Sequence, residues 1–534
     1  MTETGKYDAV FIGGGHNGLV CAFYLARAGL KVRICERRPV VGGAAVTEEF
    51  HPCFRNSVAS YTVSLLNPAV IADMRLAEHG LKILKRPISN FLPTADGRYL
   101  KVGGGLERTQ KEIAKFSARD AERLPAYYER LENVADVLRG LSMKIPPNPK
   151  KGLPAGFVAA AQLWPVAIGS GELHQDVLDL FTKNARSFLD AWFDSDPIKA
   201  AFGFDAVVGN YASPDTPGSA YVLLHHVFGE VNGEKGAWGH AIGGMGAITG
   251  AMRKACEAAG VEITVDAPVA SVCVENGGAV GVTLESGETV AGERVVANVN
   301  PKLLYTKLVP QDALEPEFAR RMQGWRCGSG TLRMNVALSE LPDFTCLPGK
   351  DVAEHHQCGI ILAPTLDYMD RAFIDAKLTG MSKKPIVEIL IPSTVDDSLA
   401  PKGAHVASLF CQQFAPELPD GRSWADEREA AADLVIDTVT EYAPNFKSAV
   451  LGRMVLSPQD LEDKFGLVGG DIMHGAMSLD QMWAARPALG YGDYTAPLKG
   501  LYLCGSGAHP GGGVSGLPGR NAARQILKGA GKTF

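Results

Sequence analysis

The sequence predicts an α/β protein in which a parallel sheet is assembled from distant parts of the chain, with an inserted α+β domain and a helical subdomain. Three observations carry this prediction. An apolar strand, a glycine-rich turn and a helix follow one another at both ends of the chain, in residues 7–29 and 501–529. Helical patterns fill residues 107–228, and strand patterns recur through residues 327–414. Such segregated elements are typical of an α/β core with a second layered domain.

The composition excludes several classes of protein. The 534 residues carry a formal net charge of -6, whereas a nucleic-acid-binding surface would be basic and clustered, so no nucleic-acid partner is expected. The start of the chain lacks the basic, apolar and small-residue progression of a secretory signal, which predicts a cytoplasmic protein, or one of the mitochondrial matrix if the source is eukaryotic. The 10 cysteines are scattered without a C-x-x-C pair and are expected to be reduced and buried.

The first glycine turn carries a dinucleotide fingerprint. In YDAVFIGGGHNGLVCAFYLARAG an apolar strand leads into Gly13-x-Gly15-x-x-Gly18, and a helix follows. Gly13 allows the tight turn, Gly15 lets a pyrophosphate reach backbone amides, and Gly18 lets the helix pack on the sheet. The next strand ends in Glu36, whose carboxylate suits ribose hydroxyls and repels a 2′-phosphate. The motif predicts an adenine dinucleotide, and leaves both FAD and NAD open.

A second glycine pair favours FAD. Gly42-Gly43 in ERRPVVGGAAVTEEF comes directly after the Glu36 strand, where an NAD-binding domain would begin its next helix. This doublet resembles the flavin-contacting motif of the amine oxidase and phytoene desaturase superfamily, and the C-terminal LYLCGSGAHPGGGVSGLPGRNAA resembles its closing flavin motif. Over nearly the whole chain the sequence is most similar to the subgroup called pyridine nucleotide-disulfide oxidoreductase domain-containing protein 2, which has bacterial phytoene desaturase-like relatives.

The resemblance implies non-covalent FAD and a Rossmann-type FAD-binding domain that is discontinuous. We expect this domain to comprise residues 1–86, 236–310 and 490–534, and the substrate-binding domain, with its helical part, to comprise residues 87–235 and 311–489.

The cofactor contacts are expected from the glycine turns and from the segments that follow the strands. The helix that begins near Pro518 should direct its positive end at the reduced flavin. The residues expected to bind FAD are Gly13, Gly15, His16, Asn17, Gly18, Glu36, Arg37, Gly42, Gly43, Ala44, Val269, Asn298, Gly505, Gly513, Val514 and Arg520.

The rest of the chain predicts further elements. PISNFLPTADGRYLKV, residues 87–102, alternates like a hairpin, and TLRMNVAL, GIILA, PIVEILI and HVASLFCQQF predict a second sheet that would floor a pocket against the flavin. Another glycine turn, Gly244-x-Gly246, opens a helix. It lacks the full spacing and a preceding apolar strand, so a second nucleotide site for NADPH is disfavoured.

The apolar segment from Leu153 to Gly169 is uncharged but interrupted by two prolines and a glutamine, and it is too short for a membrane span. We expect a core or pocket-lining helix here. The alternative is a segment that dips into a membrane surface, which would make the protein peripheral on the inner face of a membrane.

Few residues suggest acid-base or metal chemistry. His509 lies on the C-terminal glycine loop, where it either touches substrate or flavin, or supports the loop. The adjacent histidine pairs 225–226 and 355–356 do not have the i, i+4 spacing of a helical metal pair, so no metal site is expected.

We therefore expect an FAD-dependent oxidoreductase that desaturates, saturates or isomerises a largely apolar, isoprenoid- or polyene-like substrate by hydride transfer to or from the flavin. An amine oxidase-type flavoenzyme and a flavin-binding regulatory protein with little turnover remain as alternatives. Oligomeric state, direction of reaction and electron acceptor are open at this point.

Overall fold

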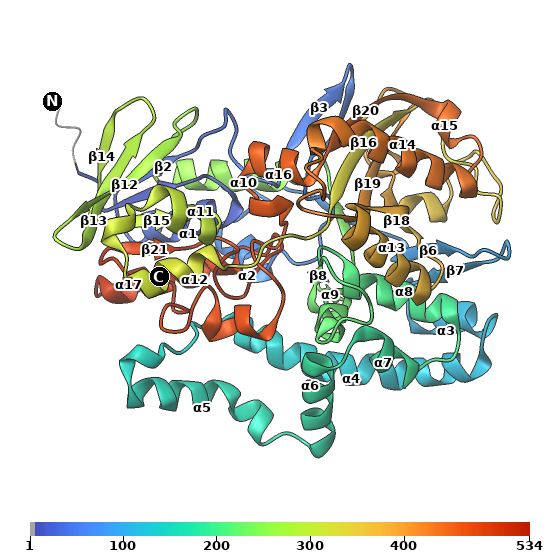
Figure 1. Cartoon of the computed structure of the whole chain (residues 1–534), viewed down its shortest axis with the longest axis horizontal. Coiled ribbons are helices and arrows are strands. Elements are labelled where there is room, and N and C mark those ends of the chain that lie inside the picture. Colours follow the sequence, from blue (N-terminus) through green and yellow to red (C-terminus); the bar gives the residue numbers. More distant parts are fainter. Residues whose placement is uncertain (1–5, 534) are drawn as a thin grey trace.

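The computed structural model describes residues 6–533, apart from the side chains of His225 and His226. Two β-rich halves lie side by side, and a row of helices runs along one edge of the molecule (Figure 1). The described residues nearest the two ends of the chain lie in the same half (Figure 1). The first and last segments of the sequence therefore meet in one structural unit.

The half that holds both ends is built around a five-stranded parallel sheet in the order β11-β2-β1-β15-β21. The residues of β1, β2 and β15 are all buried, so these strands read as near-continuous apolar runs rather than alternating ones. The strands are β1 (Ala9–Ile12), β2 (Val32–Cys35), β11 (Glu262–Thr264), β15 (Val295–Ala297) and β21 (Leu501–Leu503), and helices α1 (His16–Arg27) and α17 (Leu517–Gly529) pack beside them.

The strand order fixes the ligand-binding edge of this sheet. β1 lies between β2 and β15, so the chain adds strands first on one side of β1 and later on the other. In open parallel sheets, ligands bind at the carboxyl ends of the strands beside such a reversal. Gly13 follows β1, Glu36 follows β2 and Asn298 follows β15. Three of the predicted cofactor residues therefore lie at that edge.

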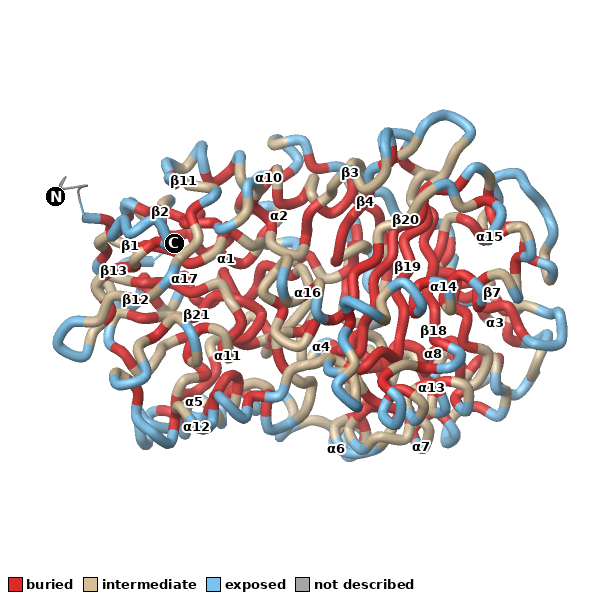
Figure 2. Tube along the Cα trace, turned by 45° about the horizontal axis from the view of Figure 1, so that its top comes forward, coloured by how far each residue is buried: buried red, intermediate tan, exposed pale blue. Residues whose placement is uncertain are grey.

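The second half contains a seven-stranded sheet in the order β20-β16-β19-β18-β17-β6-β7. The four predicted strands of residues 327–414 and the predicted hairpin of residues 87–102 are all confirmed in it. Its inner strands are buried along almost their whole length (Figure 2). The strands are β6 (Asn90–Pro93), β7 (Tyr99–Val102), β16 (Leu332–Leu338), β17 (Gly359–Leu362), β18 (Met381–Leu390), β19 (His405–Phe414) and β20 (Val450–Leu456), and α13 (Leu366–Thr379) and α14 (Trp424–Tyr442) pack on them.

The helical row connects the two halves. Its longest member, α4, begins where the Ser117 side chain accepts a hydrogen bond from the Asp120 amide. The helical pattern predicted from residue 107 onward is therefore divided into two helices at Ser117. The helices of the row are α3 (Leu106–Ala114), α4 (Ala118–Ser142), α5 (Leu153–Ala167), α6 (Gly171–Thr182), α7 (Ala185–Asp190) and α8 (Asp196–Val207).

The prediction that the Leu153 to Gly169 segment is a core or pocket-lining helix is wrong. The segment forms α5, but only Ala155 and Gln162 of that helix are buried, whereas Phe157 is 76% exposed and Trp164 60% exposed. The apolar run does not pack into the protein because α5 projects from the end of the helical row as one arm of a hairpin with α6 (Figure 1). Apolar composition alone could not distinguish a helix covered by the chain itself from one left uncovered.

A buried charged cluster joins the two halves. The Tyr61 hydroxyl donates to Glu388 on β18, and the guanidinium of Arg333 on β16 lies 4.5 Å from the centre of the Tyr61 ring. Arg86 donates from Nη2 to Thr62 Oγ1 at 2.7 Å. Burial raises the pKa of the Glu388 carboxyl, although both arginines oppose the shift. The cluster fixes the segment of Tyr61 and Thr62 onto the second sheet.

Candidate functional site

The turn after β1 is closed by contacts between glycines and backbone. Gly13 has a φ of +90°, a conformation that side chains disfavour, and its amide donates to the Cys35 carbonyl at 2.9 Å. A Cβ on Gly18 would lie 2.7 Å from the Gly13 carbonyl oxygen, and one on Gly15 would lie 2.7 Å from Asn298 Nδ2. The predicted fingerprint residues therefore form a cradle that is open only because they lack side chains.

Glu36 lies beside this cradle at the end of β2. Its carboxylate accepts hydrogen bonds from the amides of Gly14, at 2.7 Å, and Arg38, at 2.9 Å. The Glu36 carbonyl accepts from Ala267 at 2.8 Å, which brings the chain just before Val269 alongside it. Glu36 and Val269 thus share the side of the sheet that suits the adenosine end of a dinucleotide.

The second glycine pair closes over the first turn. Gly42 donates to the Gly14 carbonyl at 2.9 Å, and a Cβ on Gly43 would lie 3.4 Å from Gly15 Cα. Ala44 follows, and its carbonyl accepts from the Ser60 amide at 3.0 Å. The Gly42-Gly43 segment, which favoured FAD over NAD in the sequence, therefore covers the phosphate-binding turn.

The C-terminal glycine loop completes the site. Asn17 at the start of α1 donates to Ser506 Oγ at 3.1 Å, directly after Gly505. The His16 ring bonds the backbone of Gly513. Gly519 at the start of α17 packs so closely on the Asn17 carbonyl that any side chain would overlap it. The N-termini of α1 and α17 therefore converge, and both present positive dipole ends to one place.

Two expected cofactor residues point elsewhere. Arg37 is exposed and donates to the carbonyl of Asp463 at 3.1 Å, at the end of α16 (Pro458–Phe465). The Arg520 guanidinium lies 3.9 Å from Asp73 and 6.0 Å from the centre of the Tyr24 ring. Each arginine flanks a correctly predicted motif, but these contacts hold its side chain against neighbouring helices. Val514 is half-buried and packs against the core of the parallel-sheet half.

His509 supports the loop. Its ring Nε2 bonds the Leu141 carbonyl at 3.1 Å, and its own carbonyl accepts from the Tyr494 hydroxyl at 2.7 Å. Burial lowers the pKa of this imidazole to about 4, so it is neutral near pH 7. Of the two roles open for His509, the contacts favour the structural one.

The sequence reasoning missed two buried residues beside the loop. Arg486 donates to the carbonyls of Ser506, at 2.8 Å, and Met473, at 2.7 Å, and burial lowers its pKa to about 10. Burial also lowers the pKa of His474, to about 3. Both come from an irregular segment without periodicity, so only the tertiary structure reveals that they reach the site.

The structure also shows why Gly244-x-Gly246 is a poor nucleotide turn. The amide of Met245 donates to Ser57 Oγ at 2.9 Å, and that of Gly246 donates to Thr47 Oγ1 at 3.0 Å. The strand before the turn, β10 (Gly239–Ala241), pairs with β5 (Ile83–Lys85) outside the parallel sheet. The first amides of helix α10 (Met245–Ala258) are therefore committed to hydroxyl caps rather than to a phosphate.

A cavity of about 380 Å³ opens beside the C-terminal loop. Gly511 and Gly512 form one wall, and the end of α4 forms another through Ser142 and Met143. The side chains around it are mostly apolar. They include Leu65, Leu66, Pro68, Tyr221, Leu224, Phe228, Met477, Met482 and Leu517.

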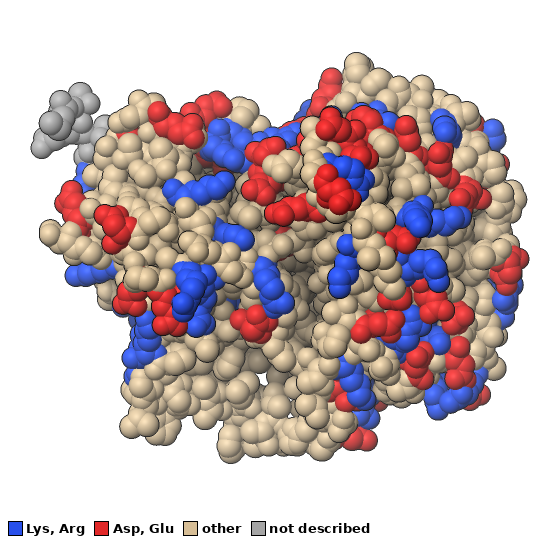
Figure 3. Space-filling model, viewed as in Figure 1, with Lys and Arg blue, Asp and Glu red and all other residues tan. Residues whose placement is uncertain are grey.

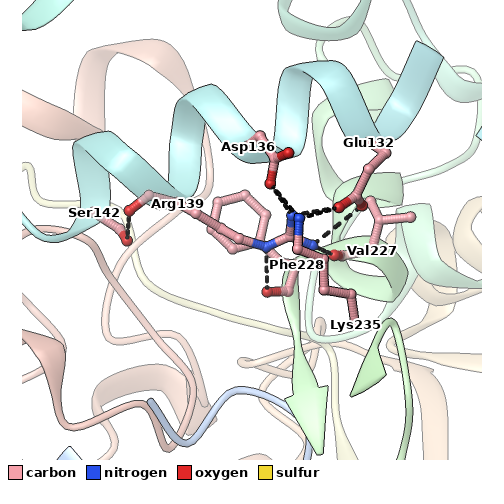
Figure 4. Close-up of polar contacts among 7 residues, drawn as sticks. All are labelled: Glu132, Asp136, Arg139, Ser142, Val227, Phe228 and Lys235. Atoms are coloured by element: carbon pink, nitrogen blue, oxygen red, sulfur yellow. Dashed lines mark hydrogen bonds and ion pairs between the residues drawn. The ribbon is translucent and has the colours of Figure 1, made fainter. Parts of the chain in front are cut away.

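Arg139, which lines this cavity, belongs to a charged bridge between α4 and residues 227–235 (Figure 4). Arg139 on α4 donates to Glu132 at 2.8 Å, to Asp136 at 2.6 Å and to the Phe228 carbonyl at 3.2 Å. Lys235 donates to the same two carboxylates, each at 2.8 Å. The bridge fixes α9 (His225–Phe228) against α4, and a second cavity of about 500 Å³ lies on its other side, with Glu132 and Lys235 in its lining.

The residues at the strand edge fit FAD. In the part of the chain that the structure describes, His16 Nε2, Asn17 Oδ1 and His474 Nδ1 are buried without a hydrogen-bond partner. Buried polar atoms normally have partners, and a dinucleotide with its flavin ring would supply them. With the glycine cradle and the two helix N-termini, these atoms form a site for an anionic, polar-edged cofactor. Among the described residues, no group of three or more His, Cys, Asp or Glu side chains is arranged for a metal ion.

The C-terminal loop gives a direct test of this placement. Gly513 has a φ of +97°, and a Cβ there would lie 2.5 Å from Leu65 Cδ1. Gly513→Val should weaken FAD affinity by about tenfold, because strain of this kind costs roughly 1–3 kcal/mol. It should also lower the flavin midpoint potential, because the displaced loop no longer presents α17 to the reduced ring. Fluorescence titration and spectroelectrochemistry measure the two effects.

The matched control for this test is Gly277→Val. Gly277 has a φ of +74° and open space around its Cα, so valine is strained there without touching the site. It should lower thermal stability and leave FAD affinity unchanged. Equal FAD affinity in both variants and the wild type would place the flavin elsewhere.

Comparisons with known proteins identify the family. The family model described as flavin containing amine oxidoreductase matches residues 18–331. The rat pyridine nucleotide-disulfide oxidoreductase domain-containing protein 2 is 42% identical over 98% of this chain and 94% of its own length. One of the subunits of limonene dehydrogenase from Castellaniella defragrans is 25% identical over 99% of this chain and 96% of its own.

Solved structures share the fold. A triple mutant of putrescine oxidase superposes with a TM-score of 0.61 at 17% identity, covering 98% of this chain and 99% of the oxidase. At that identity the likeness concerns the architecture, which is the Rossmann-type domain with an inserted substrate domain. The family match and the rat relative confirm the resemblance inferred from the glycine motifs.

Proposed function

Because this chain belongs to the flavin containing amine oxidoreductase family, we propose that it uses FAD to transfer hydride to or from a largely apolar substrate, held in the cavity beside residues 510–512. The chain is an FAD-dependent oxidoreductase, and its FAD is non-covalent. When bound, FAD supplies the two-electron redox chemistry. The proposed part is the substrate: an isoprenoid- or polyene-like molecule that is desaturated, saturated or isomerised.

The observation that carries the proposal is the lining of the cavity. Leucine, methionine, proline and aromatic side chains surround most of it, and the glycine loop that closes the cofactor site forms one wall. A pocket of this kind binds apolar molecules and excludes water. Flavin-dependent dehydrogenation at an unactivated carbon requires alignment and a dry pocket rather than an extensive set of acids and bases.

The charges around the cavity support an uncharged substrate. Two guanidinium groups, Arg139 and Arg486, line it, and Glu230 supplies a carboxylate. Arg139 is paired with two carboxylates, but the buried Arg486 donates to backbone carbonyls, so a protonated amine would approach this fixed cation, which raises the free energy of binding. The limonene dehydrogenase relative is named for an apolar hydrocarbon, and this similarity also supports the proposal.

The protein's own residues have separate tasks in this reaction. The converging N-termini of α1 and α17 would hold the negative charge of the cofactor, and Arg486 holds the loop through the Ser506 carbonyl. The site histidines stay neutral because burial lowers the pKa of His16 and His509 to about 4. The apolar walls then orient the substrate and exclude water.

The test is anaerobic mixing of the FAD-loaded protein with two sets of compounds. Polyenes, isoprenoids and monoterpenes form one set, and primary, secondary and polyamines form the other. We expect flavin bleaching by reduced members of the first set, or reoxidation of chemically reduced protein by unsaturated members. Bleaching by amines alone would establish the amine oxidase-type function instead, and no reaction with either set would favour the regulatory protein.

A single substitution separates the two substrate classes. Glu230→Gln removes the carboxylate from the lining but keeps its size. With an apolar substrate, kcat/KM should change by less than about twofold. With an ammonium substrate it should fall by about thirtyfold or more, because the buried cation loses its partner. Steady-state kinetics on the best compound of each set, with FAD content as a control, gives the answer.

A further inference from the structure

The uncovered helix α5 has an unusual surface. Its 15 residues contain no Asp, Glu, Lys or Arg. Leu153 is 83% exposed and Ile168, just after the helix, 63% exposed, and Phe157 and Trp164 between them are also mostly exposed. The space-filling view shows an uncharged lobe at this corner of the molecule (Figure 3). Monomeric proteins in water rarely leave so continuous an apolar surface uncovered.

The geometry of the hairpin favours lying on a bilayer over crossing it. No single helix among the described residues is long and apolar enough to cross a membrane, and α5 and α6 are bent by 111° relative to each other. A helix of this length lies in the plane of the interface, with apolar side chains reaching the acyl region. Trp164 and Phe157 suit that boundary, where aromatic rings are enriched.

The charges at the base of the hairpin complement an anionic surface. Lys144, Lys150 and Lys151 come just before α5, and all three are exposed, although Lys151 is also paired with Asp493. On α6, the carboxylates of Asp176 and Asp179 are paired with Arg130 and Lys183, and the exposed Glu172 lies 3.7 Å from Arg130. Leu489, which is 57% exposed, precedes Gly490, whose neighbour is the Lys150 side chain. Apolar and basic groups therefore occur together at the base.

We propose that the α5–α6 hairpin docks on the surface of an anionic phospholipid bilayer, and that the substrate enters the cavity from that bilayer. If a second copy of the chain covered α5, the exposed apolar residues would lie on one face of the helix. They occur around the helix, in the consecutive runs 156–158, 160–161 and 163–165, and this pattern suits immersion among lipid chains.

The docking surface and the cavity share a wall. Gln162, on the inner side of α5, donates to the Ile145 carbonyl at 2.8 Å. Ser142 and Met143, three and two residues before Ile145, line the cavity. The Ser142 carbonyl accepts from Asn521 at 2.9 Å, in the helix that closes the cofactor site. The end of α4 therefore contacts the hairpin on one side and lines the cavity on the other. This route rests on the proposed apolar substrate, but the docking does not.

The experiment compares two double variants of the FAD-loaded protein. Phe157→Asp/Trp164→Asp places charges on the docking surface. Leu378→Asp/Leu451→Asp places them on two equally exposed leucines of α13 and β20, in the other half of the molecule. Flotation with vesicles of phosphatidylcholine and phosphatidylglycerol measures binding. FAD absorbance and circular dichroism confirm that each variant is folded.

We expect the wild type and the Leu378/Leu451 variant to float with the vesicles, and the Phe157/Trp164 variant to partition about a hundredfold less, because two deeply placed side chains no longer favour the acyl region. Adding salt should weaken wild-type binding by screening the lysines. A wild type that does not float, or one whose flotation is unchanged by the Phe157/Trp164 substitutions, would overturn the docking. So would light scattering that shows a wild-type dimer which the same substitutions dissociate.

The entry route has its own readout. With the substrate embedded in vesicles, the Phe157/Trp164 variant should lose most of its rate, and with the substrate in detergent micelles it should keep it. If the Phe157/Trp164 variant kept its rate with vesicles as well as with micelles, the entry route would be overturned, and the apolar-substrate proposal would stand. Loss of rate in neither carrier and reaction with amines would instead contradict the proposed function.

Discussion

Gly15→Val is expected to yield a colourless protein. A Cβ at Gly15 would lie 2.7 Å from Asn298 Nδ2 and 3.9 Å from Gly43 Cα, so the two branches of valine would fill the cradle between the turn and the second glycine pair. The pyrophosphate could then not reach the amides at the start of α1. FAD content after purification should fall from one per chain to a small fraction, measured as the ratio of flavin absorbance to protein absorbance.

Gly250→Val is the matched control, because a Cβ at Gly250 on α10 would meet nothing within 4 Å. This variant should keep its FAD. Thermal unfolding of both proteins without added FAD distinguishes a filled cradle from a general loss of fold. A Gly15→Val protein that retains full FAD would contradict the position assigned to the phosphates.

Lowering the pH from 7 to 5 is expected to destabilise the protein markedly and to release FAD. Burial lowers the pKa of His16 to about 4, of His474 to about 3 and of His509 to about 4. These bases are neutral in the folded protein, but in the unfolded chain they take up a proton near pH 6.5. Stability is therefore full above pH 6.5 and is lost as the pH falls toward the folded pKa values. Each histidine contributes about 2 kcal/mol between pH 7 and pH 5.

Thermal unfolding followed by flavin fluorescence at pH 7 and pH 5 measures this loss. His509→Gln isolates one histidine, because an amide can still donate to the Leu141 carbonyl but does not titrate. The variant should lose about 2 kcal/mol less than the wild type over the same interval. An identical pH dependence in the two proteins would show that His509 is protonated in the folded state.

The glycine motifs were predictable because each obeys a local rule. Gly13, Gly15 and Gly18 sit at a strand-to-helix turn whose spacing is set by the approach of a phosphate and a neighbouring helix, so sequence alone locates them. The contacts of Asn17 and Asn298 follow from the same turn. Strands such as β16 and β19 were equally predictable from the sequence, since long buried strands keep a continuous apolar pattern.

Other features depend on contacts that no local rule encodes. Arg37 and Arg520 flank correct motifs, but Asp463 and Asp73 lie within reach of their guanidinium groups. Arg486 is a charged residue in an irregular segment, and its burial arises only when the 505–516 loop packs over it. The exposure of α5 was mispredicted for a related reason. Apolar composition indicates that a segment is removed from water, but it does not identify the surface that covers the segment.

The order of strands in the parallel sheet has a consequence for synthesis. The ribosome delivers β1 and its glycine turn well before β15, which pairs with β1 and comes almost 300 residues later, and it delivers β21 and α17 later still. Pairings this distant in sequence form slowly and late. Until β15 is made, the nascent chain therefore carries an unclosed phosphate turn and one unpaired edge of β1. Cofactor capture waits for α17, because a chain without that helix lacks the helix N-terminus that completes the site.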